Sequence, residues 1–583
     1  MRRALRTLPK TLDETYERIL LNIDELYRED VHKVFQFLAF SARPVSLEEV
    51  VEALAVNLEG NPRFDLEQRY PEPRDIITRC SSLVSISTHT SHWQETHVKH
   101  QLQLAHFSVK EYLVSERIHS GPACAYAVTE KCSHEFLARV SLAYLLQFNS
   151  LDCSKKSIVK DFPLALYAAE HWMAHAHSGQ GADLTELQPL IMDFLQPSQS
   201  CYVNWIQLCD IDDAQSAAKH PIYYTSQAGM TGITKLLLDR VSSMDAWRRN
   251  CSIALQAASS AGKEAVVQLL LDESNNMQDI EFVHALQIAS VRGCESVVQL
   301  LVNSGVDINM QAGQYGNALQ AAAVRGNKSL VQFLLDRGAN INALGGFYGN
   351  ALQAASLRGH KAVVQLLLDR GAEVNLQGGN YNSAIQAASF MGQDSAVELL
   401  LDYGANVNTL GRPHGCALAA AAYFNHEFTV KLLLERGADI NLQYGKSDNA
   451  LQAAAYRGNI SIVELLLDEG ADVNWRAGEN GNALQSASLG GYKSIVQLLL
   501  DKGADINAKE GEHGSALQAA SFAGHKFLVE FLLDRGADIN ARGGSHGSAL
   551  QAASFAGHKS LVKFLLERGA DTNLKEGEYN NAA

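Results

Sequence analysis

Hydrophobic and polar positions recur through most of the chain with a fixed period of 33 residues. The clearest marker is an alanine that opens the same phrase in every unit. These alanines are Ala285, Ala318, Ala351, Ala384, Ala417, Ala450, Ala483, Ala516, Ala549 and Ala582. Ala254 precedes them at a spacing of 31 residues, and a blurred unit begins near Pro221. Such self-similarity predicts a stacked solenoid, in which each unit buries its apolar face against its neighbours.

One unit, residues 316–348, shows how the pattern predicts elements. Asn317 stands where a helix N-cap belongs, and apolar residues at helical spacing follow it until Gly326. A second amphipathic stretch ends at Gly338, and a loop then leads to the next cap. The equivalent caps are Asn350, Ser383, Asn449, Asn482, Ser515 and Ser548, with Cys416 as the one poor capping residue. Each unit therefore predicts a helix, a turn, a second helix and a projecting loop, which we call the finger.

The phrase ALQAASLRGHKAVVQLLLDRGAEVNLQGG, residues 351–379, resembles the ankyrin repeat, and about eleven such units cover residues 206–583. The resemblance implies a mainly α-helical ankyrin-repeat solenoid whose concave groove takes a protein ligand. The family's Thr-Pro-Leu-His opening reads Asn/Ser-Ala-Leu-Gln here, as at 350–353. The Thr–His hydrogen bonds between neighbouring family repeats must then be rebuilt with Gln, a change that could loosen the stack. The units at 221 and 254 lack the Gly-Ala-Asp-Ile-Asn phrase and are expected to be worn or capping repeats.

Two columns of residues follow the repeat spacing and form the candidate binding surface. The helix column, late on each first helix, holds Val324, Leu357, Phe390, Tyr423, Tyr456, Leu489, Phe522 and Phe555. The finger column holds Tyr315, Tyr348, Tyr381, His414, Ser447, Asn480, His513, His546 and Tyr579. The ankyrin resemblance implies that the helix column faces the groove, and aromatic residues are enriched in binding hot spots. Alternatively, the two columns pack on each other and only brace each finger against its helix.

Residues 1–200 contain no repeat and predict a mixture of helices and strands. Three capping boxes, in which a Ser or Thr is followed three residues later by Glu, stand at residues 11–14, 46–49 and 108–111. They are expected to open helices through about Leu26, Leu54 and Leu113. Residues 83–87 and 102–104 are predicted to be the strands of a hairpin. Helices followed by a hairpin indicate a winged-helix-like domain.

We place this winged-helix-like domain at residues 29–118, with a helical tail at 1–28 and a helical linker region at 119–205. Four phrases, at 8–20, 43–54, 104–113 and 163–176, resemble the region that follows the nucleotide-binding NACHT module in fungal signal-transducing ATPases. That region also occurs as the winged-helix domain named after GPI inositol-deacylase. The resemblance implies a module that relays the nucleotide state of an ATPase to a repeat sensor.

The nucleotide-binding module itself has no counterpart in the sequence. No G-x-x-x-x-G-K-[ST] loop occurs, and the nearest stretch, residues 262–264, lacks the hydroxyl that would hold magnesium. The first family phrase begins close to Met1, and the chain stops at Ala583, two residues into a new repeat helix. We therefore expect a fragment or an incomplete gene model, with an upstream NACHT domain as a candidate partner in the full-length protein.

Composition narrows the class of partner and the compartment. The net charge is −15, and both the first 200 residues and the remainder are acidic, which argues against nucleic acid and anionic membranes as partners. Nine cysteines occur without a C-x-x-C pair, which favours reduced thiols inside the cell. There is no signal-peptide core and no run of eighteen apolar residues. A cytoplasmic protein is expected.

Three motifs that could carry chemistry have simpler structural explanations. Residues 543–547 match G-x-S-x-G, but they lie in a finger, whereas a hydrolase needs a strand before the motif and a helix after it. His171 and His175 share a helical face, but Trp172 stands where a zinc protease needs Glu. The helix expected at 75–79 offers too little positive charge for DNA. No catalytic residue, cofactor site or metal site is predicted.

The leading hypothesis is a non-enzymatic interaction protein, the sensor or scaffold arm of a fungal immune-type receptor, which takes a protein ligand in its ankyrin groove. An alternative is the carboxyl-terminal part of an ATP-driven switch whose nucleotide-binding domain is absent here. A winged-helix regulator that binds DNA is the third and least favoured hypothesis.

Overall fold

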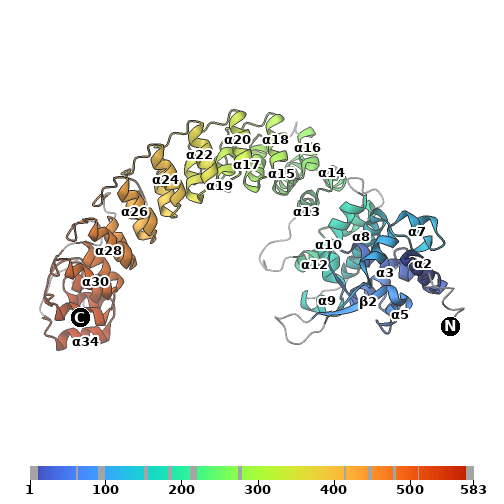
Figure 1. Ribbon diagram of the computed structural model, residues 1–583, viewed down its shortest axis with the longest axis horizontal. Coiled ribbons are helices and arrows are strands. Elements are labelled where there is room, and N and C mark those ends of the chain that lie inside the picture. The colour runs from blue at the N-terminus through green and yellow to red at the C-terminus, as the bar shows by residue number, and fades with distance from the viewer. Residues whose placement is uncertain are drawn as a thin grey trace. The chain divides into compact units, whose positions relative to one another are not determined.

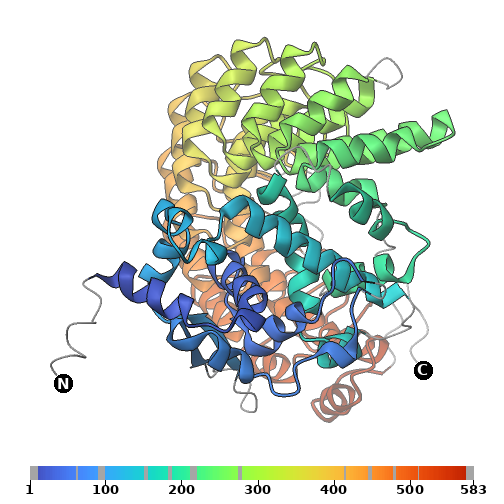
Figure 2. The same ribbon diagram turned by 90° about the vertical axis from the view of Figure 1, so that its right-hand side faces the viewer.

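A computed structural model describes most of the chain, namely residues 11–60, 63–89, 99–149, 155–180, 187–209, 220–273, 279–412, 415–443, 449–476, 481–509 and 511–572. The chain divides into two compact units, Met1–Met277 and Gln278–Ala583. Both are largely helical (Figures 1 and 2). The division falls inside the predicted repeat array, so the helix pairs at 221–239 and 244–272 belong to the first unit.

The first unit begins with the winged-helix-like part. Its helices are α2 (Leu12–Leu21), α3 (Arg28–Phe40), α4 (Leu47–Leu54), α5 (Asp75–Arg79), α6 (Phe107–Leu113) and α7 (Glu116–Ser120). Its strands are β1 (Val45–Ser46), β2 (Val84–His89) and β3 (Lys99–Leu104), which form an antiparallel sheet in the order β1-β3-β2. The predicted hairpin is confirmed as β2 and β3. Strand β1 was not predicted, because two residues carry no periodicity and it is defined by pairing of Val45 with Leu102.

Two of the three predicted capping boxes open helices as expected. The Thr11 side chain accepts a hydrogen bond from the Glu14 amide at 3.2 Å, and Ser46 and Glu49 satisfy each other's amides in a complete box. The box predicted at Ser108 is wrong. Helix α6 begins two residues earlier than predicted, at Phe107, because His106 is its N-cap and accepts from the Ser108 amide at 3.3 Å.

The helix predicted to run through Leu26 is shorter than expected. Helix α2 ends at Leu21, and the chain resumes as a single tight turn at Glu25–Tyr27. The reason is local, because the Asp24 carboxylate accepts from the Leu26 amide at 3.0 Å and caps this new turn.

The rest of the first unit is helical. It contains α8 (Glu130–Leu146), α9 (Lys155–Asp161), α10 (Ala165–Gln180), α11 (Gln188–Phe194) and α12 (Ser200–Cys209). Helices α8 and α10 pack along each other. Their large side chains join one continuous core with the winged-helix-like part, and its largest fully buried members are Trp172, Trp205, Tyr144, Tyr167, Tyr202 and Phe35. The described helices of the predicted helical linker at 119–205, α8 to α12, therefore pack in the same core as the winged-helix-like part.

The first unit ends with two helix pairs, α13 (Pro221–Ala228) with α14 (Thr231–Asp239), and α15 (Met244–Ser260) with α16 (Glu264–Asp272). The first members, α13 and α15, pack on each other, as do the second members α14 and α16. This is the stacking expected of repeats. The atypical length of α15 agrees with the prediction that the units at 221 and 254 depart from the regular pattern.

The second unit is a curved row of helix pairs (Figure 1). Its first helices are α17 (Asp279–Arg292), α19 (Ala318–Arg325), α21 (Ala351–Arg358), α23 (Ala384–Phe390), α25 (Ala417–Tyr423), α27 (Ala450–Arg457), α29 (Ala483–Gly490), α31 (Ala516–Phe522) and α33 (Ala549–Phe555). Its second helices are α18 (Glu295–Asn303), α20 (Lys328–Asp336), α22 (Lys361–Asp369), α24 (Asp394–Asp402), α26 (Glu427–Glu435), α28 (Ile460–Asp468), α30 (Lys493–Asp501), α32 (Lys526–Asp534) and α34 (Lys559–Glu567). Each first helix packs on the next, because its alanines are buried and small.

The glutamine that replaces the family's histidine links neighbouring repeats. In α19, Gln320 Oε1 accepts from the Asn317 amide at 2.8 Å, and Gln320 Nε2 donates to the Gly349 carbonyl of the next finger at 2.8 Å. The same donation to a carbonyl 29 residues on is made by Gln287, Gln353, Gln386, Gln452, Gln485 and Gln518. The hydrogen-bond network that we expected to be rebuilt with Gln is thus rebuilt along the solenoid.

Candidate protein-binding face

The two predicted columns lie against each other. The rings of Tyr381 and Phe390 are 5.1 Å apart between centroids, and those of His513 and Phe522 are 4.9 Å apart. Phe522 also lies 4.7 Å from His546, which in turn lies 4.8 Å from Phe555. The fingers therefore cover the carboxyl-terminal ends of the first helices. We call the surface that the two columns make together the finger–helix face.

Within each column, rings from successive repeats stack on one another. The centroids of Tyr315 and Tyr348 are 6.3 Å apart with their planes 12° from parallel. His513 and His546 stack at 6.1 Å, Tyr423 and Tyr456 at 6.4 Å, and Phe522 and Phe555 at 6.5 Å. The aromatic side chains thus form ordered rows along the repeats.

Hydrogen bonds from the following repeat hold the helix column in place. The carbonyl of Phe390 accepts from His426 Nε2 at 3.1 Å, and that of Tyr423 accepts from Asn459 Nδ2 at 3.2 Å. The equivalent bonds join His360 to Val324, His525 to Leu489 and His558 to Phe522. Because a carbonyl only accepts, these imidazoles carry their hydrogen on Nε2. The rings of Phe390, Tyr423 and Phe522 are therefore attached to a backbone that the following repeat fixes.

The predicted site residues differ in the solvent exposure of their side chains. Tyr348 and Leu357 are buried, with exposed fractions of 9% and 4%, and so serve the interior. Phe555 is 55% exposed. The other described members are half-buried, namely Val324, Phe390, Tyr423, Tyr456, Leu489, Phe522, Tyr315, Tyr381, His513 and His546. His414, Ser447, Asn480 and Tyr579 lie outside the described residues.

A third column, one residue after the helix column, was missed by the sequence analysis. It holds Arg292, Arg325, Arg358, Met391, Phe424 and Arg457 at the same 33-residue spacing. Phe424 packs 4.4 Å from Phe390 and 4.9 Å from Tyr423, and the Arg457 guanidinium lies 4.9 Å from the centre of the Tyr423 ring. The signal was present in the spacing, but a search for aromatic side chains alone passes over the arginines.

The charge of the finger–helix face comes from these arginines. Burial lowers the pKa of His513 and of His546 below the ordinary value of 6.5, so both imidazoles are neutral at pH 7. Burial raises the pKa of Tyr381, whose hydroxyl is also neutral. The finger column is thus uncharged at these positions, and the neighbouring Arg358 is the cation, with Nη2 donating to the Tyr348 hydroxyl at 3.4 Å.

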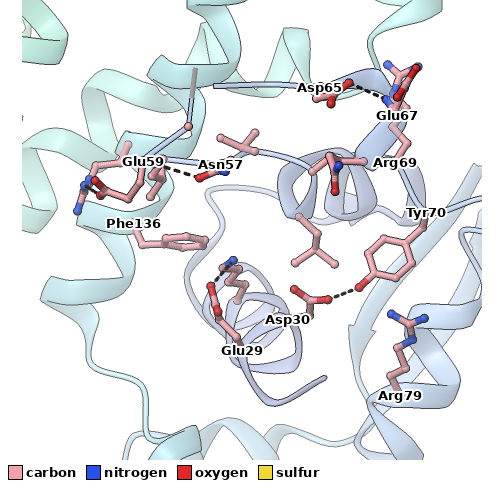
Figure 3. Close-up of a pocket in the computed structure, with 18 of the residues that line it drawn as sticks. Glu29, Asp30, Asn57, Glu59, Asp65, Glu67, Arg69, Tyr70, Arg79 and Phe136 are labelled. Atoms are coloured by element: carbon pink, nitrogen blue, oxygen red, sulfur yellow. Dashed lines mark hydrogen bonds and ion pairs between the residues drawn. The ribbon is translucent and has the colours of Figure 1, made fainter. Parts of the chain in front are cut away.

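A polar cavity of about 1010 Å³ lies in the first unit, between α3, α4, α5 and α8 (Figure 3). Its charged side chains mostly pair with one another. Lys33 is 2.6 Å from Glu29, the Tyr70 hydroxyl donates to Asp30, and Arg79 lies 4.5 Å from the centre of the Tyr70 ring. The cavity lining is polar, and its Tyr70 hydroxyl is held by the Asp30 carboxylate.

The histidine pair and the G-x-S-x-G stretch noted in the sequence both make structural contacts in the fold. His175 lies 2.8 Å from His134 Nδ1 and 2.8 Å from the Tyr167 hydroxyl, and burial lowers its pKa to about 4. Residues 543–547 form a finger turn, closed by the Gly543 amide on the Gly547 carbonyl at 3.1 Å. Among the described residues, no group of three or more His, Cys, Asp or Glu is placed to hold a metal ion. No helix in that part of the chain is long and apolar enough to cross a membrane.

Comparisons with known proteins agree with this architecture. The family model for ankyrin repeats (3 copies) matches residues 222–312, 286–378, 319–411, 352–444, 418–510 and 508–576. The model for the winged-helix domain of GPI inositol-deacylase matches residues 17–128, a wider span than the predicted 29–118.

The chain is also similar to a curated fungal protein and to a solved ankyrin-repeat domain. The azaphilone pigments biosynthesis cluster protein L of Monascus ruber is 36% identical over 292 residues, which are 46% of this chain and 60% of that protein. The chain thus spans about three-fifths of this curated relative. The crystal structure of the human ASB11 ankyrin repeat domain is 28% identical, with a TM-score of 0.34, and the match covers 38% of this chain and 98% of that one.

Proposed function

The chain belongs to the ankyrin-repeat family, and we propose that its solenoid binds a protein ligand on the finger–helix face and catalyses no reaction. Ankyrin repeats are typically non-catalytic modules that bind other proteins. The observation that carries the proposal is the row of half-exposed aromatic side chains that neighbouring repeats hold in fixed stacks. A rigid aromatic surface gains affinity because little side-chain entropy is lost on binding.

The experiment uses the full chain and a phage-displayed peptide library. Selected clones should bind the wild type and lose binding when Phe390, Tyr423, Tyr456 and Phe522 are changed to Ala. A matched control changes two exposed aromatic residues of the second helices, Phe428 (64% exposed) and Phe527 (83% exposed), to Ala. Because Phe522 also contacts His513 and His546, circular dichroism must show that the fourfold variant keeps its helices.

Loss of capture in the fourfold variant and retention in the control would support the proposed function. Unchanged capture by the folded fourfold variant would remove the helix column from the binding site. Equal loss in both variants would point to general destabilisation and contradict a site on this face.

The first unit suggests the setting in which this binding acts. We propose that its GPI inositol-deacylase-type winged-helix domain relays a signal between the repeats and a nucleotide-binding partner, in the manner of fungal NACHT proteins, and that the protein works in the cytoplasm. The support is the family match at 17–128 and the similarity to a protein of the fungus Monascus ruber. On this proposal the repeats are the sensor or scaffold arm of an immune-type receptor.

The alternative, an ATP-driven switch of which this chain is one part, gives a simple test. Because the sequence contains no phosphate-binding loop, isothermal titration of ATP into this chain should give no heat of binding. Measurable ATP binding would contradict that interpretation of the sequence.

A further inference from the structure

We propose that the ligand of the finger–helix face is an extended acidic protein segment with an apolar centre, docked along α19 to α27. This inference rests on the proposed function and specifies the chemistry of the partner. It begins with the third column, in which exposed arginines stand on both sides of an apolar pair. In chain order the column presents Arg325, Arg358, Met391, Phe424 and Arg457.

The two sides of the repeats differ in how their cations are paired. On the second helices, Arg370, Arg436 and Lys502 lie 3.0, 2.8 and 2.8 Å from Asp336, Asp402 and Asp468 of the preceding repeat. Among the described residues, no carboxylate forms an ion pair with an arginine of the third column. Within the described part of the chain, Arg325 and Arg358 thus have no carboxylate partner, and a carboxylate of a ligand can pair with them.

The sequence around these arginines keeps acidic side chains away. None of the nine first helices from residue 285 onward holds Asp or Glu between its opening alanine and its last turn, although the whole chain carries a net charge of −15. The finger tyrosine Tyr381 near Arg358 is neutral, because burial raises the pKa of its hydroxyl. The first helices from α19 to α27 thus present arginines and no carboxylate in a protein of net charge −15, which is the complement of an acidic ligand.

The centre of the column is apolar. Met391 is 42% exposed, and Phe424 is backed by the rings of Phe390 and Tyr423. The column thus has apolar and aromatic side chains at its centre and cations at both ends. This is the arrangement of a binding hot spot with a charged rim. One apolar side chain of the ligand fits against this pair, while its carboxylates reach the arginines.

Repeat spacing sets the length of the ligand segment. Packed helices lie about 8–10 Å apart, so three repeats place Arg358 and Arg457 about 24–30 Å from each other. An extended peptide rises about 3.3 Å per residue, and about eight residues therefore separate the two acidic positions that these arginines engage. The guanidinium group pairs with a carboxylate through two parallel hydrogen bonds, which favours Asp or Glu over a neutral polar residue.

A nucleic acid is the less suitable polyanion. Tyr423 already has the Tyr456 ring at 6.4 Å and the Arg457 guanidinium at 4.9 Å from its centre, which leaves less of its face open to a base. Bases need free aromatic faces for stacking, and a net charge of −15 repels a long phosphate backbone. A short acidic segment with one apolar anchor meets neither obstacle.

Two phage-displayed libraries of 14-residue peptides test the inference on the full chain. Both have a randomised apolar centre, and the flanks are Asp and Glu in one library and Lys in the other. We expect enrichment from the acidic library alone. For the best acidic peptide, R325E/R358E should weaken binding at least tenfold, measured by fluorescence anisotropy. The control R337E/R370E reverses the same number of charges at the far ends of the second helices of the same repeats, and should change affinity less than twofold.

The opposite outcomes are equally clear. Enrichment from the Lys library, enrichment from neither, or an affinity that ignores R325E/R358E would overturn the acidic partner. If peptides from an unbiased library still lose binding in the aromatic variant while ignoring the arginines, the proposed function stands and this inference fails. Binding of a 14-nucleotide single-stranded DNA with comparable affinity, lost in R325E/R358E, would assign the face to nucleic acid instead.

Discussion

The repeat that begins at Ala417 differs from its neighbours in the residues that hold a repeat together. Where other repeats have Asn or Ser, glutamine and glycine, this one has Cys416 as the cap, Ala419 at the linking position and Asn425 after the first helix. Cys416 Sγ accepts from the Ala419 amide at 3.4 Å, a weak bond, and Ala419 has no side chain to donate to the next finger. The same repeat supplies Tyr423 and Phe424 to the densest part of the aromatic surface. The comparison teaches that the repeat without the glutamine link is also the one that supplies two adjacent rings to the candidate contact surface.

The largest expected effect comes from removing a regular link. Gln320→Ala deletes the bonds to the Asn317 amide and the Gly349 carbonyl, and it leaves the buried Asn317 amide without its partner, whereas the Gly349 carbonyl keeps its bond from the Gly345 amide. We expect a loss of about 2–3 kcal/mol in the free energy of unfolding, measured by urea denaturation. Gln332→Ala, whose side chain bonds Asp336 on an exposed helix surface, is the control and should cost about 0.5 kcal/mol or less. Equal effects would mean that the glutamine row does not hold the stack.

The second-largest effect is expected from substitutions that restore the regular cap and link to the repeat that begins at Ala417. Cys416→Asn together with Ala419→Gln should rebuild the reciprocal cap seen at Asn449 and Gln452. We expect a gain of about 1–2 kcal/mol in the free energy of unfolding, and less from either change alone because the cap is reciprocal. No gain from the pair would show that other packing already compensates in this repeat.

A smaller effect on stability is expected at one of two asparagines whose backbones are left-handed, and none at the other. Asn425 has φ of 63° and an exposed side chain, so Asn425→Gly should stabilise by about 0.5–1 kcal/mol. Asn382 has φ of 64°, but its Nδ2 donates to Gln386 Oε1 at 2.8 Å and to the Leu410 carbonyl at 3.0 Å. Asn382→Gly should therefore give no increase in stability when both variants are measured by thermal unfolding. The same response at both positions would contradict the role of the Asn382 side chain.

The smallest effect concerns the ion pairs of the second helices. Glu469 stands where Arg436 and Lys502 pair with the preceding repeat, and its counterpart there is Glu435, a like charge. Glu469→Arg should stabilise by about 0.2–1 kcal/mol at low salt and by less at 0.5 M salt, since exposed pairs are weak and screened. A gain that does not depend on salt would exclude the ion pair as its cause.

The sequence predicted the repeating helices well because period, cap and glycine are local signals. Asn317, Gly326 and their counterparts define the helix ends without knowledge of the fold. The role of Gln320 was only anticipated in outline, because its partner lies 29 residues away and comes near only when repeats stack. Strand β1 was not predicted for the same reason, since Val45 becomes a strand residue only by pairing with the distant Leu102.

The candidate site was predicted in part. The columns at Phe390, Tyr423 and Phe522 are real rows of rings, but the contacts of Phe522 with His513 and His546 show that bracing accounts for some of them. Whether the same rows bind a ligand stays a prediction. The arginines of the third column were missed because single cations in some repeats indicate a site only when their neighbours are known to lack carboxylates.

The most direct test of the account is hydrogen–deuterium exchange of the full chain with and without the best acidic peptide. The account predicts slower exchange in the fingers and first helices between residues 315 and 457, and unchanged exchange in the second helices and in residues 11–209. Protection confined to the second helices, or to the first unit, would contradict a binding site on the finger–helix face.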